Sequence, residues 1–375
     1  MTIKKKRIGV VFGGRSGEHE VSLNSAASAL QYLDREKYEV IPIAITEQGN
    51  WLWGVEPEKL LQARKDPALG ESQADTSAVA VKAGSDAPQS LIDLQSGNPL
   101  SSVEALDVFF PILHGPHGED GTIQGLFEMA NVPYVGCGVL GSAIGMDKEI
   151  MKKIFHMAGL PLVASLTFKH HSWERNPEDV LDTIEQRLPY PCFVKPANLG
   201  SSVGVNKARD RAELERAVKL AFSYDRKIVV EQGHAVREFS CAVLGNDEPQ
   251  VSVVGEVLHG SDFNSYEAKY VNHTAQFDIP ATHIPDEQAQ ELRAMALRAY
   301  KALDLNGMAR VDFFLDTDTN TYYINEVNTM PGFEKTSLYP QLWAVSGLSY
   351  PQLLDRLIQL AQERYAEKQQ RRYSR

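Results

Sequence analysis

The chain has 375 residues, more than one hydrophobic core usually supports, so two or three domains are expected. Its formal net charge of −11 argues against nucleic acid as the main partner, because phosphate backbones select basic surfaces. No apolar stretch approaches the ~20 residues that span a bilayer, and the apolar run after the basic residues 4–7 is too short for a signal peptide. Three scattered cysteines without metal-binding spacing predict reduced, mostly buried thiols in a cytoplasmic protein: Cys137, Cys192 and Cys241.

Residues 1–145 predict an amino-terminal α/β domain. A helix begins near Val21, and strands are predicted at 7–12, 39–45 and 105–113. Strands that alternate with helices indicate a parallel sheet. Residues 67–102 are rich in small and polar residues without a helical stripe, so we expect a loop-rich surface insertion there.

Residues 146–235 predict a small central lid domain. Its first helix, at 147–158, ends at the stop signal Gly159-Leu160-Pro161. Strands are predicted at 162–168, 192–195 and 228–231, helices at 177–186 and 212–224, and a Gly/Ser loop at 198–204. This alternation fits a lid rich in β-α-β units.

Residues 236–375 predict a β-rich carboxy-terminal domain. Its expected elements are strands at 238–244 and 250–258, a polar loop at 261–275, a helix at 286–303, a hairpin at 310–328 and a closing helix. The closing helix has an apolar stripe made of Leu353, Leu354, Leu357, Ile358 and Ala361.

The hairpin is the most informative segment. If it folds symmetrically about its polar turn, Asp312 lies opposite Glu326 and Arg310 opposite Asn328. Strand side chains repeat with period two, so all four would project from one face. Hard oxygens and a guanidinium in a small area suit Mg²⁺ and phosphate oxygens. Taken alone, the same face also fits a solvated charged strand surface, which is common.

The Gly/Ser loop has the residues of an anion-binding turn. Lys195 precedes it at a strand end, and Gly200 and Gly204 would let backbone N–H groups approach an anion. Ser201 and Ser202 add hydroxyl donors, although an ordinary Gly/Ser turn is an equally good explanation. The chain contains neither a P-loop motif nor the G-x-G-x-x-G fingerprint of dinucleotide-binding folds.

Two polar turns follow strands of the amino-terminal domain, where open α/β sheets usually bind ligands. The first contains Glu18 and Ser22, which would fit a ligand role or a helix cap equally well. The second contains His114 and His117, for which we favour substrate contact or loop scaffolding over metal binding. A loop with Lys269 and Tyr270 could close over a reaction and exclude water.

Seven segments together carry a resemblance that none carries alone. In chain order they are GGRSGEHEVSLNSA, LHGPHGEDGTIQG, GMDK, VKPANLGSSVG, YEAKY, RVDFF and NEVNTMPGF. They resemble the ATP-grasp enzymes and, more closely, the bacterial D-alanine–D-alanine ligases. The resemblance implies a three-domain α/β (α+β) ATP-grasp fold. It also implies ATP-dependent ligation of two D-alanine molecules through an acylphosphate, for peptidoglycan synthesis and cell wall biogenesis.

The resemblance also implies a nucleotide and metal site. Lys148 and Lys195 look like the lysines that hold ATP phosphates, and Lys269 looks like the loop lysine that reaches the terminal phosphate. Ser202 belongs to the phosphate-covering loop. Glu231 looks like the residue beside the adenine and Glu238 like the ribose acceptor. The ligands of two Mg²⁺ (or Mn²⁺) ions look like Asp312, Glu326 and Asn328, with Glu326 bridging.

For the amino-acid substrates, Glu18 and His114 look like contacts to the first D-alanine. The groups around the second D-alanine and the tetrahedral intermediate look like Arg310, Gly332, Ser337 and Leu338. Ser201, Tyr270 and Glu18 look like a hydrogen-bonded trio that joins lid, loop and amino-terminal domain. The family also implies a homodimer. One alternative is a D-alanine–D-lactate ligase, which shares almost every motif, and the YEAKY loop argues against it. A second alternative is a catalytically silent ATP-binding module, and the intact Arg310 argues against it.

Overall fold

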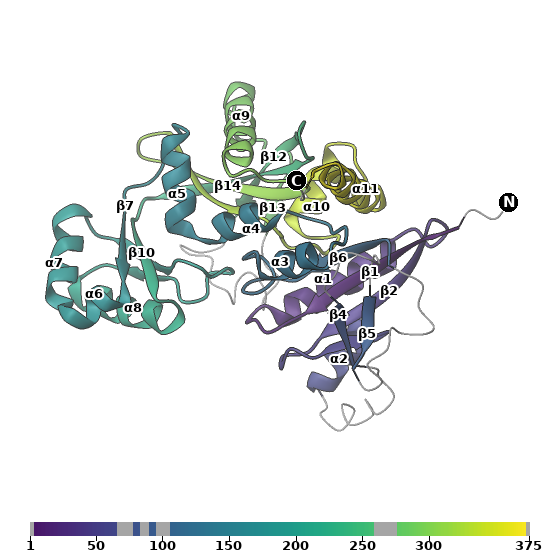
Figure 1. Cartoon of the computed structure of the whole chain (residues 1–375). Coiled ribbons are helices and arrows are strands. Elements are labelled where there is room, and N and C mark those ends of the chain that lie inside the picture. The colour runs from purple at the N-terminus through teal and green to yellow at the C-terminus, as the bar shows by residue number, and fades with distance from the viewer. Residues whose placement is uncertain (1–3, 66–77, 83–89, 95–105, 259–275, 373–375) are drawn as a thin grey trace.

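The computed structural model describes residues 4–65, 78–82, 90–94, 106–258 and 276–372 of the chain. Three β-sheets, each with its own helices, are arranged around a shared centre (Figure 1). Among the described residues, no helix is both long and apolar enough to cross a membrane.

The first sheet has the strand order β5-β4-β3-β2-β1-β6. Its strands are β1 (Lys6–Gly13), β2 (Tyr38–Ile45), β3 (Trp51–Trp53), β4 (Ala78–Lys82), β5 (Ser90–Asp93) and β6 (Val108–Ile112). β1 pairs in parallel with β2 and β6, as predicted for these three strands, but β3, β4 and β5 are added in antiparallel pairs, so the sheet as a whole is mixed. Its helices are α1 (His19–Tyr32), α2 (Pro57–Lys65) and α3 (Thr122–Met129).

The insertion at 67–102 has more structure than its composition predicts. Within the described residues, β4 and β5 pair as an antiparallel hairpin and extend the first sheet beyond β3. Val79 and Leu91 are buried and join the hydrophobic core on one face of this sheet. Two short apolar segments are enough to form a pair of strands at a sheet edge. The polar residues around these segments hid their periodicity in the sequence, so the strands were not predicted.

The second sheet, with order β7-β10-β8-β9, forms the lid lobe at the left of Figure 1. Its strands are β7 (Ser165–Lys169), β8 (Cys192–Pro196), β9 (Asn206–Ala208) and β10 (Lys227–Gln232), and its helices are α6 (His170–Arg175), α7 (Pro177–Arg187) and α8 (Arg211–Tyr224). The sheet is antiparallel throughout, and it encloses its own hydrophobic core. Asn176 and Asp210 cap α7 and α8 through their side chains, which fixes where both helices begin.

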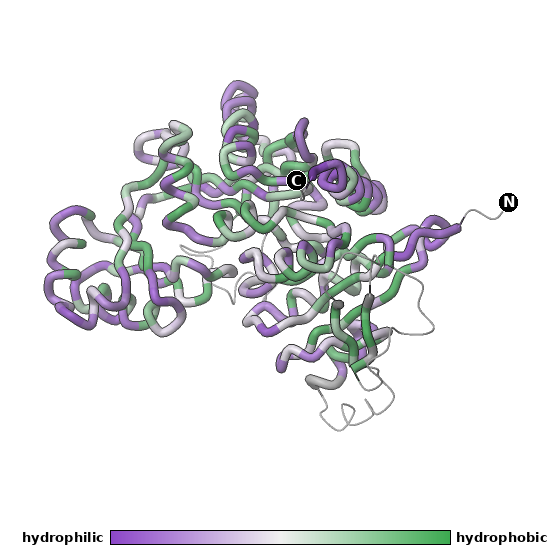
Figure 2. Tube along the Cα trace, in the orientation of Figure 1, coloured by the Kyte–Doolittle hydropathy of each residue, from purple (hydrophilic) through white to green (hydrophobic). Residues whose placement is uncertain are grey.

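The third sheet is also antiparallel and has the order β13-β12-β11-β14-β15. Its strands are β11 (Val236–Leu244), β12 (Gln250–Leu258), β13 (Gln276–Asp278), β14 (Met308–Asp316) and β15 (Thr321–Asn328), and its helices are α9 (Asp286–Ala302), α10 (Leu338–Val345) and α11 (Tyr350–Gln369). The whole predicted stripe of α11, from Leu353 to Ala361, is buried. Figure 2 shows hydrophilic residues on the outer turns of α9 and α11.

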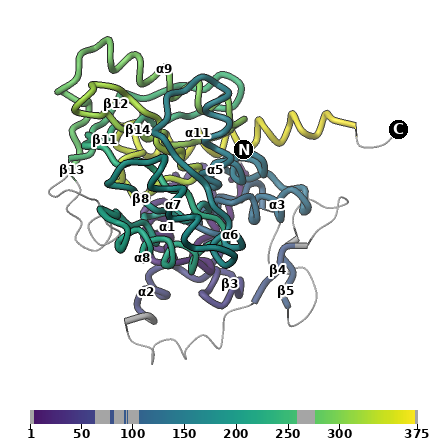
Figure 3. Tube along the Cα trace, turned by 90° about the vertical axis from the view of Figure 1, so that its left-hand side faces the viewer, coloured from purple at the N-terminus to yellow at the C-terminus, as the bar shows by residue number. Residues whose placement is uncertain are grey.

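Two helices connect the sheets: α4 (Val139–Met146) and α5 (Lys148–Met157). The apolar residues Met151 and Phe155 of α5 are fully buried in the core of the third sheet, together with α9. A second core joins α11 and α10 to α1 and to one face of the first sheet. In the turned view of Figure 3, the lid helices α6, α7 and α8 face the reader and α11 extends to the side with the C-terminus. All three cysteines are free and buried, as predicted.

Candidate active site

The hairpin of β14 and β15 has the register that the sequence predicts for its polar half. Arg310 pairs with Asn328, and Asp312 pairs with Glu326. A β-bulge follows directly between Asp312 and Phe313 and offsets the register by one residue nearer the turn. The symmetrical folding that the sequence predicts therefore holds only for the end of the hairpin that carries the polar side chains.

Asp312 is the centre of the polar contacts on this face. Arg310 donates to it twice, from Nε to Oδ1 at 2.8 Å and from Nη2 to Oδ2 at 2.7 Å. Asn328 Nδ2 donates to Oδ2 at 2.8 Å, and Ser240 Oγ on β11 donates to Oδ1 at 2.6 Å. These contacts hold both carboxylate oxygens of Asp312 in place. Ser240 was missed by the sequence analysis, because its place opposite Asp312 depends on the pairing of β11 with β14.

The oxygen atoms on this face fit a hard divalent cation. Asp312 and Glu326 supply carboxylates and Asn328 an amide, and Mg²⁺ is usually held by one or two carboxylates together with phosphate oxygens. Over the described ranges, no group of three or more His, Cys, Asp or Glu side chains could hold a metal ion. Two carboxylates and one amide are the protein ligands expected for an ion that also binds phosphate oxygens.

A buried charged triad lies beside this face, on the lid side. Glu231 accepts from Lys195 Nζ at 2.6 Å, and Lys152 Nζ lies 2.8 Å from its other oxygen. The three residues are 3%, 9% and 6% exposed, so water screens them little. Burial alone would raise the pKa of Glu231, but Lys152 and Lys195 overcome this effect and lower that pKa to about 2. The carboxylate is thus ionised at neutral pH.

Lys152 was also missed by the sequence analysis. The available signal was its spacing, because Lys148 and Lys152 are four residues apart on α5 and therefore lie on one side of the helix. Both are buried, and both point toward acidic residues of other elements.

Two predicted lysines lie close to predicted metal and nucleotide residues. Lys148 Nζ donates to the Leu199 carbonyl at 2.8 Å and is 3.6 Å from Glu326 Oε2. Burial would lower the pKa of Lys195, but the charge of Glu231, followed by those of Glu326 and Glu238, raises it. The structure therefore brings these lysines together with the acidic face of the third sheet.

The Gly/Ser loop of the lid reaches the amino-terminal part of the chain. Ser201 and Ser202 both have positive φ, at +50° and +58°, a conformation that is uncommon outside glycine. Ser201 Oγ donates to a carboxylate oxygen of Glu18. Two members of the predicted trio are therefore in direct contact. Lys269 and Tyr270 lie outside the described residues.

Glu18 stands at the start of α1, but its side chain makes no capping hydrogen bond. The helix-cap explanation of Glu18 is therefore wrong, and its carboxylate is directed to the lid instead. Ser22 has a structural role, because its Oγ accepts a hydrogen bond from the Gly13 N–H at 2.7 Å and donates one to the Ile112 carbonyl. It thus ties β1 to the end of β6.

His114 is held from both sides of its ring. Nδ1 lies 3.1 Å from the Met330 carbonyl and Nε2 lies 3.2 Å from Ser25 Oγ. A carbonyl oxygen only accepts, so Nδ1 carries the proton and Nε2 accepts from the hydroxyl. Burial lowers the pKa of His114 to about 4, although the bond to Met330 acts in the opposite direction. The ring is therefore neutral at pH 7.

Glu119 is a buried acid that the sequence analysis did not single out. It accepts from the Gly115 N–H at 2.8 Å and from the Met330 N–H at 3.2 Å. Burial, and then the negative charge of Glu18, raises the pKa of Glu119 well above its ordinary value. It joins the loop after β6 to the segment that follows β15.

The three remaining predicted residues lie in that segment. A side chain on Gly332 would meet Ser337 Oγ at 3.3 Å, and the same oxygen accepts from the Glu334 N–H at 3.1 Å. Leu338 is only 6% exposed, and its side chain belongs to the core shared with α11.

A lid sheet with buried lysines that faces an antiparallel sheet with acidic residues defines an ATP-grasp enzyme. Family comparisons agree: residues 7–137 match the description "D-ala D-ala ligase N-terminus" and residues 154–359 match "D-ala D-ala ligase C-terminus". The chain belongs to the D-alanine–D-alanine ligase family.

Individual relatives cover nearly the whole chain. The D-alanine--D-alanine ligase of Bacillus cytotoxicus is 48% identical over 372 residues, which are 99% of each chain. Among solved structures, the D-alanine-D-alanine ligase from Coxiella burnetii has a TM-score of 0.83 at 34% identity, with 98% of this chain and 97% of that chain covered. The VanG D-Ala:D-Ser ligase from Enterococcus faecalis has a TM-score of 0.81 at 38% identity, with 96% and 100% covered.

Proposed function

We propose that this chain joins two D-alanine molecules into D-alanyl-D-alanine, with ATP converted to ADP and phosphate. The observation that carries the proposal is the position of Lys148. Its Nζ lies 3.6 Å from Glu326 Oε2 and donates to the Leu199 carbonyl, so this lysine stands between the acidic face of the third sheet and the Gly/Ser loop of the lid. A nucleotide phosphate placed there would meet a lysine on one side and carboxylates on the other. The family to which the chain belongs is one of ATP-dependent ligases.

The nucleotide would lie between the second and third sheets. Lys148 and Lys195 would bind its phosphates, with Ser202 and the Gly/Ser loop above them. Glu231 would accept from the adenine and Glu238 from the ribose. The ionised state of Glu231 supports this assignment, because a carboxylate accepts hydrogen bonds and does not donate them. Lys269 would reach the terminal phosphate.

Asp312, Glu326 and Asn328 would hold two Mg²⁺ or Mn²⁺ ions together with the phosphates. When bound, these ions neutralise charge that develops on the transferred phosphoryl group. The donor set of hard oxygens supports this choice of metal.

The chemistry requires activation, because a carboxylate oxygen is a poor leaving group. Transfer of the terminal phosphoryl group of ATP to the carboxylate of the first D-alanine would give an acylphosphate. The amine of the second D-alanine would attack that carbonyl carbon, and phosphate would leave. Glu18 and His114 would orient the first D-alanine, while Gly332, Ser337 and Leu338 would surround the second.

Arg310 would stabilise the oxyanion of the tetrahedral intermediate, and loss of one such donor typically costs about 10²–10³ in rate. The acylphosphate hydrolyses easily, so water must be excluded during the reaction. The contact between Ser201 and Glu18 supports a lid that closes on the amino-terminal domain. Tyr270 would complete the trio from the loop side.

The test is phosphate release from ATP, measured with D-alanine, with L-alanine and with no amino acid. Phosphate release that requires D-alanine supports the proposal. Release independent of any amino acid would contradict it, and a complete lack of turnover would favour the silent ATP-binding alternative.

The second substrate needs a separate test, because the solved relative from Enterococcus faecalis is named a D-Ala:D-Ser ligase. D-alanine would be mixed with equal amounts of D-lactate and D-serine, and the products resolved by mass spectrometry. The YEAKY segment resembles that of ligases with an amine nucleophile, so a dipeptide should dominate over the depsipeptide near neutral pH. The family to which the chain belongs favours D-alanyl-D-alanine as that dipeptide. A depsipeptide or D-alanyl-D-serine as main product would contradict this specificity.

We further propose a cytoplasmic homodimer that makes peptidoglycan precursors. The three functional parts would be residues 1–145 for the amino-acid substrate, 146–235 for the lid and 236–375 for catalysis. Sedimentation equilibrium measures the oligomeric state, and a concentration-independent monomer mass would contradict the dimer.

A further inference from the structure

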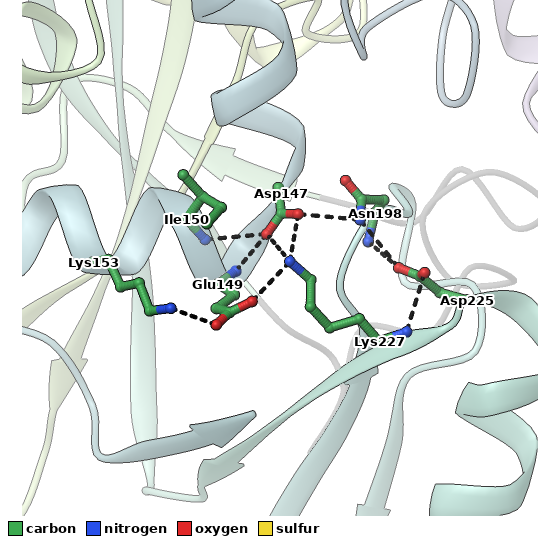
Figure 4. Close-up of polar contacts among 7 residues, drawn as sticks. All are labelled: Asp147, Glu149, Ile150, Lys153, Asn198, Asp225 and Lys227. Carbon is green, nitrogen blue, oxygen red and sulfur yellow. Dashed lines mark hydrogen bonds and ion pairs between the residues drawn. The ribbon is translucent and has the colours of Figure 1, made fainter. Parts of the chain in front are cut away.

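A cluster of polar contacts lies where α5 meets the lid, beside the site described above (Figure 4). Lys227, the first residue of β10, reaches both oxygens of Asp147 at 2.8 and 2.6 Å. The same Nζ lies 2.8 Å from Glu149 Oε2. Lys227 is buried at 8% exposure, so each of these pairs is only weakly screened by solvent.

Asn198 connects the same cluster to the Gly/Ser loop. Its Nδ2 lies 3.3 Å from Asp147 Oδ2 and 3.2 Å from Asp225 Oδ2. Its backbone N–H donates to Asp225 at 2.8 Å. The amide therefore holds the first residue of the loop against the turn that leads into β10 (Figure 4).

The cluster spans two parts of the molecule. Asp147 caps α5, because its Oδ1 accepts from the backbone N–H groups of Glu149 and Ile150. The apolar side of α5 is packed into the core of the third sheet, whereas Lys227 belongs to the lid sheet. Lys227 is thus an ionic bridge across the joint between the lid and the third sheet.

Lys148 lies inside this joint, between the two acids that Lys227 binds. Its backbone N–H donates to the Ala197 carbonyl at 3.0 Å, and its Nζ donates to the Leu199 carbonyl at 2.8 Å. Asp147 and Glu149 flank it in sequence, so without Lys227 two carboxylates beside Lys148 would lack their shared buried cation. Lys153 would still pair with Glu149, but it is exposed and donates to the other oxygen.

We propose that Lys227 is a positioning residue for nucleotide binding. It fixes the angle of the lid against α5 and neutralises the acids on either side of Lys148, so that Lys148 is available to a nucleotide phosphate. This inference rests on the proposed phosphate-binding role of Lys148. It predicts an effect on nucleotide affinity that is separate from any effect on fold stability.

The test compares Mg·ADP dissociation constants of the full-length protein by titration calorimetry. Lys227→Met should weaken binding about tenfold or more, equivalent to about 1.4 kcal/mol. Lys227→Arg keeps the charge and should recover most of the affinity. The control is Lys219→Met, which removes an exposed lid lysine whose partner is Glu215 on the same helix, and it should leave the affinity unchanged.

Two further measurements separate an effect of Lys227 on nucleotide binding from an effect on fold stability alone. If Lys227 acts by neutralising its acids, Lys227→Met combined with Glu149→Gln should bind Mg·ADP more tightly than Lys227→Met alone. If Lys227→Met does not fold, Lys227→Gln is titrated instead, alone and combined with Glu149→Gln, and the two dissociation constants are compared in the same way. A lowered melting temperature with unchanged affinity in every Lys227 variant would overturn the proposal. Because ADP binding needs no amino acid, this outcome is independent of which product the enzyme makes.

Discussion

The buried pair of Lys152 and Glu231 gives a stability prediction whose size follows from the structure. Glu231 has an ordinary pKa of 4.5 and a folded pKa of about 2. A difference of about 2.5 in pKa corresponds to about 3 kcal/mol of stability at neutral pH, at about 1.4 kcal/mol for each pKa unit. The carboxylate is only 3% exposed, so solvent screening reduces this figure little.

Lys152→Met removes one of the two cations that hold the carboxylate ionised. We expect the free energy of unfolding to fall by about 2–3 kcal/mol at pH 7, because Glu231 keeps Lys195 but loses half of its compensation. The control is Lys153→Met on the same helix, whose side chain is 64% exposed and whose loss should cost less than about 0.5 kcal/mol.

The sign of the pH dependence follows from the lowered pKa. A carboxylate whose folded pKa is below its unfolded value stabilises the protein above the unfolded pKa, and this stability is lost as pH falls through the folded pKa. The difference between wild type and Lys152→Met should therefore be constant from pH 8 to pH 6 and shrink below about pH 4.5, toward the folded value of about 2. Urea unfolding at pH 7 and at pH 4 measures both points. Equal stability of the two proteins at pH 7 would refute the reasoning.

Three further predictions concern the site itself. Asp312→Ala removes the carboxylate contacted by Arg310, Asn328 and Ser240. We expect the rate of ADP formation to fall by at least about 10²-fold while the circular dichroism spectrum stays unchanged. Near-normal turnover would be incompatible with the metal assignment. Glu238→Ala should mainly raise the KM for ATP in a steady-state assay, and an unaltered ATP dependence would remove Glu238 from the ribose site. His114 should stay neutral from pH 8 to pH 5 in nitrogen-15 NMR, because burial lowers its pKa to about 4; a titration near 6.5 would contradict this.

The polar face of the hairpin could be predicted because strand geometry is local. Period-two alternation and one turn place Arg310, Asp312, Glu326 and Asn328 from the sequence alone, and the structure has the predicted pairs. The bulge beside Asp312 was not predicted, since no residue type marks it. The symmetrical register succeeded because the bulge lies on the turn side of the polar pairs.

Contacts between distant segments were harder to predict. Neither Lys152 nor Glu119 belongs to a segment whose periodicity reveals its partner, and both became apparent only when tertiary packing brought in Glu231 and Met330. The hairpin of β4 and β5 was missed for a related reason. Its few apolar residues indicate strands only once the neighbouring strand β3, with which β4 pairs, is known.

The place of α5 explains why the missed lysine and a predicted one both contact acidic residues of the candidate site. Lys148 and Lys152 stand one helical turn apart, and the first lies near Glu326 of the third sheet while the second pairs with Glu231 of the lid. On the same buried side of the helix, Met151 and Phe155 are packed into the third-sheet core. Because protein cores are close-packed, α5 cannot rotate freely against that sheet. A movement of the lid must therefore strain the contact between Lys152 and Glu231 or that between Lys227 and Asp147, so the position of the lid and the geometry of α5 are mechanically linked.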